Sequence, residues 1–223
     1  MKNDNTTPMA AGVYDKEIVN TIPYYAQFYE QTMDVIEQCD YTELHWLDLG
    51  CGTGSLEQVV FQRFHQPQFV LVDPSEKMLE QAKKKLENHS VQYICGTSAS
   101  VDFASCFEVV TAIQAHHYMQ REERQEATQK VYKALKKGGI YISFENVVSE
   151  DETVKSMELL RWGRYQQRHG KTEAEAKAHN LRCGVNYFPL TVSEHIELLK
   201  QTGFEHVHVF WCSYMQMGIY GIK

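Results

Sequence analysis

Short apolar runs alternate along the chain with longer stretches in which apolar residues recur every three or four positions. The runs predict strands at residues 44–49, 69–72, 91–95, 107–113 and 140–144. The periodic stretches predict helices at residues 56–64, 75–87 and 121–135. Strands that alternate with helices of this length form a parallel sheet through right-handed crossovers, with helices on both faces. We therefore expect an α/β protein with a doubly wound, Rossmann-like sheet.

Further segments extend this core at both ends. The predicted division is an N-terminal helical segment, a core in two parts and a helical cap insertion: residues 1–40, residues 41–146 with 191–223, and residues 147–190. The N-terminal helical pattern is interrupted near Pro23. After a predicted helix over 192–202, strands at 205–210 and 213–222 are expected to pair as an antiparallel edge of the mostly parallel sheet. The charged, helical stretch 150–177 is expected to form an α-helical cap over a pocket.

The composition narrows the class of protein. The 223 residues are 43% hydrophobic and 23% charged, which suits a folded domain and excludes a disordered or fibrous chain. The net charge is −7 and no basic run is present, so nucleic acid is not an expected partner. No apolar run approaches the roughly 18 residues of a membrane span, and we expect a cytoplasmic protein without membrane contact. The six cysteines form no Cys-x-x-Cys pair and are expected to be reduced, buried thiols.

A glycine-rich turn follows the first predicted core strand. The sequence from Leu47 to Ser55 is Leu-Asp-Leu-Gly-Cys-Gly-Thr-Gly-Ser. Glycines there allow a tight turn and close approach of a ligand to the backbone, and the next helix presents free N–H groups. Asp73 lies 23 residues after Gly50, at the end of the second strand, where a carboxylate can accept both ribose hydroxyls. Together these features predict a nucleoside ligand.

The spacing of the glycines favours one kind of nucleoside. A dinucleotide loop reads Gly-x-Gly-x-x-Gly, whereas here the third glycine, Gly54, comes one residue early. Asp48 would disfavour a nearby pyrophosphate but favour the α-ammonium group of a methionine moiety. An NAD-linked oxidoreductase is therefore the last of the alternatives.

Four segments resemble motifs I to IV of the class I S-adenosyl-L-methionine (SAM)-dependent methyltransferases, in order and spacing: residues 47–56, 70–78, 95–99 and 107–118. The resemblance covers about residues 44–146 and implies SAM as cofactor and S-adenosyl-L-homocysteine (SAH) as product. The cofactor residues that follow from the pattern and the resemblance are Asp48, Gly50, Cys51, Gly52 and Gly54 at the methionine part, Asp73 at the ribose, Pro74 and Met78 along the adenosine, Thr97, Ser98 and Ala99 at the adenine edge, and Ile113 and Gln114 in the fourth motif. The usual acid of the third motif is replaced by Thr97, so that adenine N6 is expected to meet a backbone carbonyl or Ser98.

Outside this core the chain resembles the carboxy-S-adenosylmethionine synthase family, through residues 14–25, 168–170 and 202–223. That family makes a carboxylated SAM from prephenate for the modification of the tRNA wobble uridine. The resemblance implies that Tyr25 lies over the cofactor and that the protein forms a homodimer. The arginine that the family uses to hold the extra carboxylate falls at Asn180, with Arg182 two positions on. An Asn cannot replace a bidentate cation, so this departure disfavours the carboxylated product.

Methyl transfer from a sulfonium is an in-line displacement, in which the protein mainly positions the reactants and excludes water. A hydroxyl or ammonium acceptor also benefits from a general base, and His116 or His117, after the fourth strand, is our candidate. His206 and His208 share one face of a strand, but no third ligand accompanies them, so no metal site is predicted.

Candidate acceptor-binding residues come mainly from the cap. Arginines could meet an anionic acceptor, although ion pairs on the surface explain them nearly as well, and the aromatic residues could be pocket walls or ordinary core. The substrate candidates are Tyr14, Arg161, Trp162, Tyr165, Arg182 and Tyr187.

The sequence thus predicts a SAM-dependent methyltransferase that acts on an unidentified, small-molecule acceptor. The first alternative is a carboxy-SAM synthase or another SAM-modifying enzyme, which Arg182 beside the sulfonium substituent would favour. The second alternative is a SAM-binding protein without turnover.

Overall fold

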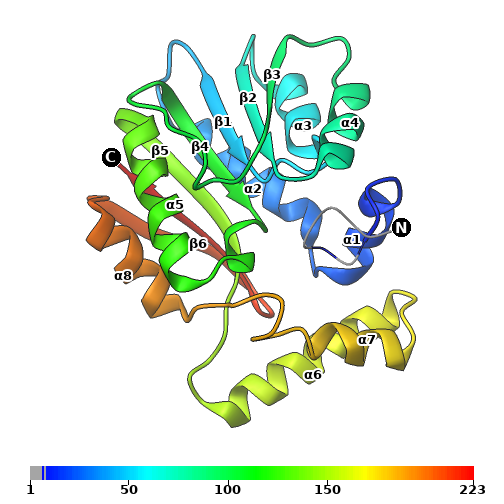
Figure 1. Ribbon diagram of the computed structural model, residues 1–223. Helices are drawn as coiled ribbons and strands as arrows, with labels where there is room; N and C mark the ends of the chain where they lie inside the picture. The colour runs from blue at the N-terminus through cyan, green and yellow to red at the C-terminus, as the bar shows by residue number, and fades with distance from the viewer. Residues whose placement is uncertain (1–6, 8) are drawn as a thin grey trace.

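A seven-stranded sheet forms the centre of the molecule, in the strand order β3-β2-β1-β4-β5-β7-β6 (Figure 1). The computed structural model describes residue 7 and residues 9–223. The strands are β1 (His45–Leu49), β2 (Gln68–Asp73), β3 (Val91–Cys95), β4 (Phe107–Ile113), β5 (Leu135–Asn146), β6 (His206–Ser213) and β7 (Gln216–Ile222). Strands β1 to β5 pair in parallel, whereas β7 is antiparallel to both β5 and β6. The predicted doubly wound, mostly parallel sheet with an antiparallel hairpin at its edge is confirmed.

Helices cover both faces of the sheet because each buried strand directs alternate side chains to opposite sides. The helices are α1 (Tyr14–Thr21), α2 (Tyr25–Ile36), α3 (Ser55–Arg63), α4 (Glu76–Lys85), α5 (Arg121–Ala134), α6 (Glu152–Arg168), α7 (Glu173–Asn180) and α8 (Val192–Thr202), with a 3-10 turn at His116–Tyr118. In β1, Trp46 belongs to the core beneath α2 and α3, and Leu47 belongs to the core beneath α5 and α8. Figure 1 shows α2 behind the sheet and α5 in front of it.

The N-terminal helices α1 and α2 are separated at Pro23, as predicted. Tyr24, the residue before α2, has a φ of 56°, a left-handed conformation that turns the chain sharply. Phe28 of α2 is fully buried, with its ring centroid 4.5 Å from that of Phe144 in β5 and 5.2 Å from that of Trp211 in β6. These aromatic contacts hold α2 against the sheet.

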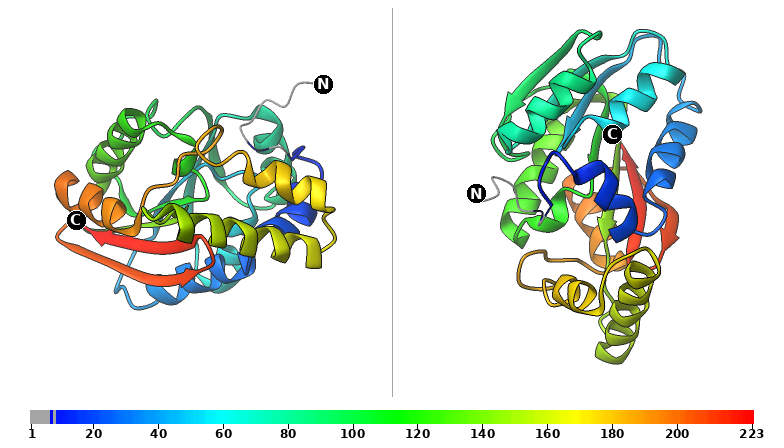
Figure 2. Two further views of the ribbon diagram at one scale, coloured as in Figure 1. Left: turned by 90° about the horizontal axis from the view of Figure 1, so that it is seen from below. Right: turned by 90° about the vertical axis from the view of Figure 1, so that its right-hand side faces the viewer.

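The cap consists of α6 and α7, which lie side by side beyond the sheet (Figures 1 and 2). The charged, helical stretch 150–177 thus forms parts of two helices. The break falls at Gly170, whose φ is 95°, and α7 then starts with a capping box formed by Thr172 and Glu175. The division of the chain at residues 41, 147 and 191 stays a prediction.

Two further expectations need correction. Strand β5 begins at Leu135 and not near residue 140, because Leu135 pairs with Phe107 across an irregularity in the register. Among the cysteines, all of them unpaired, only Cys51 is buried, while Cys95, Cys106 and Cys212 are exposed.

Within the described residues, no helix has the length and apolar character needed to cross a membrane.

Candidate functional site

A cleft lies where β1, β2 and β4 end, between the glycine loop and the N-terminal helices. The cleft is lined by residues of the loops that follow these strands and by tyrosines of α1 and α2: Thr7, Tyr14, Tyr25, Tyr29, Asp48, Gly50, Cys51, Gly52, Thr53, Ser55, Leu56, Asp73, Pro74, Met78, Gly96, Thr97, Ser98, Ile113, Gln114, Ala115, Tyr118, Met119 and Glu123. Ligands of open α/β sheets bind at this edge.

The glycine loop forms the floor of the cleft. The N–H groups of Gly50 and Cys51 both donate to the carbonyl oxygen of Val72, which ties the loop to the end of β2. Gly50 has a φ of +77°, and a Cβ there would lie 2.6 Å from the Cβ of Ala115. Only glycine therefore fits this position without moving the neighbouring loop.

Asp73 organises the loop from the side. Its Oδ2 accepts a hydrogen bond of 2.9 Å from the N–H of Gly52, and its Oδ1 accepts one of 2.8 Å from the N–H of Ser75. Two charge-assisted hydrogen bonds fix the carboxylate at the lip of the cleft. A carboxylate can accept several hydrogen bonds, including those of the ribose hydroxyl groups that the sequence predicts.

A row of tyrosines forms the wall opposite the loop. The hydroxyl of Tyr29 donates to that of Tyr25 over 3.0 Å, and Tyr14 also lies within hydrogen-bonding range of Tyr25. Burial raises the pKa of all three tyrosines well above the usual value. The wall therefore offers neutral hydroxyl groups at any physiological pH.

An ion pair joins α1 to the end of α4 beside the glycine loop, and we call this group the Asp15–Lys85 latch. Lys85 Nζ lies 2.7 Å from Asp15 Oδ2, 3.0 Å from Thr53 Oγ1 and 2.6 Å from Ser55 Oγ. The Thr53 hydroxyl donates to Asp15 Oδ1 over 2.5 Å. Although partial burial alone would raise the pKa of Asp15, these contacts lower it. The latch holds α1 across the start of α3.

Neither of the two candidate histidines lines the cleft, and both are buried behind it in different surroundings. The ring of His116 contacts Ser98 through Nε2 (2.9 Å) and Tyr141 through Nδ1 (3.1 Å), and burial lowers its pKa to about 4. Because both nitrogens have partners, His116 is better explained as a structural residue. His117 Nδ1 lies 3.2 Å from Glu145 Oε2, and burial lowers the pKa of His117 too. His117 is thus a neutral imidazole oriented by a carboxylate, as a general base requires.

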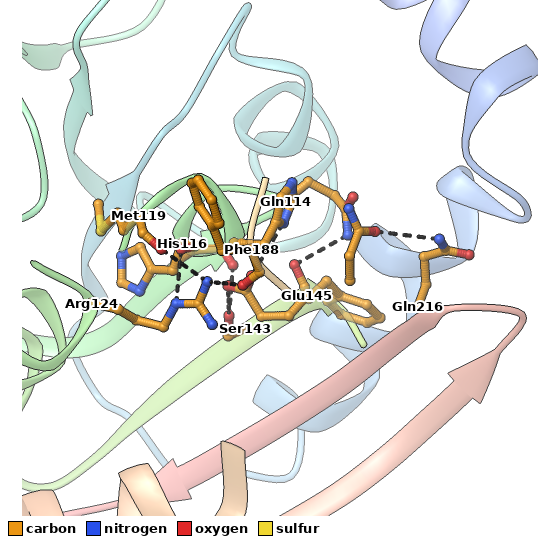
Figure 3. Close-up of polar contacts among 12 residues, drawn as sticks. Gln114, His116, Met119, Arg124, Ser143, Glu145, Phe188 and Gln216 are labelled. Atoms are coloured by element: carbon orange, nitrogen blue, oxygen red, sulfur yellow. Dashed lines mark hydrogen bonds and ion pairs between the residues drawn. The ribbon is translucent and has the colours of Figure 1, made fainter. Parts of the chain in front are cut away.

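Arg124 of α5 fixes the turn that carries these histidines (Figure 3). Its Nε donates to the carbonyl oxygen of His116, and its Nη2 donates to those of Met119 and Phe188. One guanidinium thereby connects the His116–Tyr118 turn with the segment that returns from the cap. This role has no signal in the sequence, because an arginine in the first turn of a charged helix normally faces solvent.

Most of the expected cofactor residues come together in the cleft, and two lie outside its lining. Gly54 caps α3, and its Cα faces Ala82 and Leu86 of the α4 region, so it serves the packing of two helices. Ala99 lies in the turn after β3 and does not reach the cleft. Of the residues not expected, Tyr29 could have been found, because it follows Tyr25 by four positions on one helix face.

Three cap residues that were substrate candidates instead attach the cap to its neighbours. The Trp162 indole is fully buried and donates over 2.7 Å to the carbonyl oxygen of Thr21. The Tyr165 hydroxyl donates to the carbonyl oxygen of Val19, and the Arg161 guanidinium lies 3.9 Å from the ring centroid of Tyr214. None of the three lines the cleft, because the helix face that carries them docks on α1 and the β6–β7 hairpin.

The other candidates lie at the end of the cleft or just behind it. Tyr14 lines the cleft, whereas Arg182 lies within interaction range of the Tyr118 hydroxyl, behind the lining. Tyr187 is buried, and its ring centroid lies 6.0 Å from Arg182 Cζ and 6.0 Å from the ring centroid of His117. Asn180 faces away from the cleft and donates to the carbonyl oxygen of Leu159 within the cap.

No group of three or more His, Cys, Asp or Glu side chains is arranged to hold a metal ion in the part of the chain that the structure describes. His206 and His208 are exposed on β6.

Comparison with known proteins gives relatives and a fold. A family profile described as a methyltransferase domain matches residues 47–139. A carboxy-S-adenosyl-L-methionine synthase from Wolinella succinogenes is 31% identical over 206 residues, which cover 90% of this chain and 85% of the relative. A synthase of the same name from Shewanella loihica is 26% identical over 219 residues, which cover 96% and 90%.

Solved structures resemble the whole chain. A SAM-dependent methyltransferase from Leishmania major has a TM-score of 0.69 at 14% identity and covers 97% of this chain and 79% of its own. Another from Thermotoga maritima has a TM-score of 0.63 at 17% identity, with coverage of 95% and 94%. At such identities the likeness concerns the fold alone, and it agrees with the sheet described above.

Proposed function

The chain belongs to the class I SAM-dependent methyltransferases, in the family of the carboxy-S-adenosyl-L-methionine synthases. We propose that it transfers the methyl group of SAM to a small-molecule acceptor. The membership confirms SAM, as cofactor or substrate, which the glycine loop and Asp73 had predicted. Bound SAM supplies a methyl group on a sulfonium, already activated for displacement. The chain's own residues have to bind the cofactor, orient the acceptor and exclude water.

The observation that carries the proposal is the charge of the cleft. Among the described residues that line it, those with a formal charge at neutral pH are all acids: Asp48, Asp73 and Glu123. A ligand with an ammonium group and a sulfonium suits this lining. A carboxylate on the transferred group would lack a cation in the lining, and an unpaired buried anion is costly. The acidic lining therefore supports a neutral methyl group.

The proposed acceptor site is the end of the cleft beneath the cap, where Tyr118 borders Arg182. His117, buried directly behind the lining residue Tyr118, is the proposed base for an attacking hydroxyl or amine, and Glu145 orients its ring. Burial would raise the pKa of Glu145, but the nearby histidines, His117 above all, lower it to about 2. Glu145 therefore remains charged and can stabilise a protonated His117.

A carboxy-SAM synthase is the second candidate, because Arg182 lies beside a residue of the cleft lining. The relatives that bear this name support it as well. Against it stands Asn180, whose amide is engaged within the cap.

Denaturing mass spectrometry of the cofactor after incubation decides between the two. With SAM and prephenate we expect no carboxylated cofactor, and with SAM and a set of small hydroxyl, amine and thiol acceptors we expect SAH. A carboxylated cofactor in the prephenate reaction that disappears in Arg182→Met would overturn the proposal and establish the second candidate. Arg168→Met, an exposed arginine at the end of α6, is the matched control and should behave like the unmodified protein in either case.

We also propose that the protein forms a homodimer through its cap. Val154, Met157 and Leu160 form an exposed apolar stripe on α6, and Leu181 and Val185 are exposed nearby. Contiguous exposed apolar side chains mark interaction surfaces. Light scattering should give twice the chain mass of 25.9 kDa, and Met157→Glu should give the single mass, whereas Gln125→Glu on α5 should leave the dimer intact. A single mass for the unmodified protein at micromolar concentration would refute the dimer.

A further inference from the structure

A second carboxyl group lies behind the acid of the glycine loop. Glu57 belongs to the first turn of α3 and is fully buried. Neither of its carboxyl oxygens has a hydrogen-bond partner within ordinary distance. The start of a helix favours a negative charge, but this effect is too small to offset the burial of an unpaired carboxylate.

The acid that acts most strongly on Glu57 is Asp48, which lines the cleft, whereas Glu57 does not. Asp48 is 3% exposed, lines the cleft, and accepts a hydrogen bond of 2.5 Å from the Thr111 hydroxyl. Burial raises the pKa of both carboxyl groups. The charge of Asp48 and its hydrogen-bonding interaction with Glu57 raise the pKa of Glu57 further, whereas the same interaction lowers that of Asp48. Two such groups in contact inside a protein cannot both remain ionised without a cation beside them.

The surroundings supply little countercharge. The titratable groups that act on the pair come from each neighbouring element and loop: Tyr29 of α2, Cys51 of the glycine loop, Asp73 of β2, Lys85 of α4 and Tyr93 of β3. Lys85 is the one cation among them, and its ammonium group is already bound in the latch to Asp15. Burial keeps Tyr29 and Cys51 neutral by raising their pKa values.

We propose that Glu57 and Asp48 share one proton when no cation is bound, and that the ammonium group of a ligand's amino-acid part displaces this proton to solvent. No bond within the ligand changes, since the ammonium group takes the place of the shared proton as the positive charge beside the pair. Glu57 thereby makes the cleft selective for a nucleoside that carries an ammonium group. The inference rests on the proposed function, which supplies such a ligand.

The sign of the pH dependence follows. A bound ammonium group lowers the pKa values of the pair, which are raised in its absence. At a pH between the pKa values of the pair in the complex and those of the pair in the free protein, binding releases a proton. The affinity therefore increases with pH, by at most about tenfold per pH unit for one proton. Below this window both forms are protonated and the dependence disappears.

Calorimetry in buffers of different ionisation enthalpy measures the proton directly, at pH 6 to 7.5, where SAH keeps its own ammonium group. We expect the unmodified protein to release close to one proton on binding SAH and none on binding 5′-methylthioadenosine, which lacks the amino-acid part. Glu57→Gln should release none with SAH, and its dissociation constant should be independent of pH. Glu76→Gln, an exposed acid in the first turn of α4, should match the unmodified protein.

Equal proton release by the unmodified protein and Glu57→Gln, or equal release with the two ligands, would overturn the inference. Absence of any SAH binding would instead contradict the proposed function. If Glu57→Gln does not fold, the infrared difference spectrum of the unmodified protein still decides, because SAH should remove the C=O band of one protonated carboxylic acid. A spectrum without that loss would also overturn the inference.

Discussion

Asp73→Asn will weaken SAH binding by about 100-fold, or nearly 3 kcal/mol, if the carboxylate accepts two ribose hydroxyls at about 1.5 kcal/mol each. The loss has a second source within the protein. Asp73 Oδ2 accepts the N–H of Gly52, and an amide nitrogen in that place would set two donors against each other. The substitution therefore disturbs the loop as well as the ribose contact. Isothermal titration calorimetry with SAH measures the effect.

Asp102→Asn is the matched control for this change. Asp102 is an exposed carboxylate that pairs with Lys130 and Lys133 on the surface, away from the cleft. Its replacement should leave SAH affinity unchanged, since exposed ion pairs contribute little. A folded Asp73→Asn protein that binds SAH as tightly as this control would contradict the role of Asp73.

Trp162→Ala will lower the free energy of unfolding by about 3–5 kcal/mol. The indole of Trp162 is fully buried, hydrogen-bonded to Thr21, and packed with its centroid 4.6 Å from that of His179. Its removal leaves a cavity between the cap and α1 and an unpaired carbonyl group. Urea unfolding followed by circular dichroism measures the loss.

The comparison for Trp162 is Gln167→Ala, at an exposed position on the same helix. A surface change to a good helix former should alter the unfolding free energy by about 0.5 kcal/mol or less. Should Trp162→Ala unfold at the same urea concentration as Gln167→Ala, the cap would not depend on this contact for its attachment.

The parallel core was predictable because its strands carry their own signal. Residues 69–72 are apolar throughout, as a strand buried on both faces requires, and Asp73-Pro74 ends the run. The break between α6 and α7 also has a signal in the sequence, since Thr172 and Glu175 have the spacing of a capping box that starts a new helix. The early start of β5 had none, because it depends on the pairing of Leu135 with Phe107.

The cofactor side of the candidate site was predictable where the backbone itself contacts a ligand. The glycines and Asp73 follow from the turn between strand and helix. The acceptor side of the site was not predictable from the sequence. Tertiary packing decides which face of α6 docks on α1, and this packing directs Trp162 and Tyr165 away from the cleft. Glu57 was missed for a similar reason, since an acid in a first helical turn is usually exposed and here the packing of α3 buries it.

The tyrosine wall and the Asp15–Lys85 latch have a consequence for what counts as the functional unit. The segment that matches the methyltransferase profile, residues 47–139, contains the glycine loop and Asp73 but none of the three tyrosines. It also contains Lys85 without Asp15. A fragment with those limits would cover one side of a bound nucleoside and leave the other side exposed to solvent. The smallest part of the chain that encloses the ligand therefore has to include the helices α1 and α2.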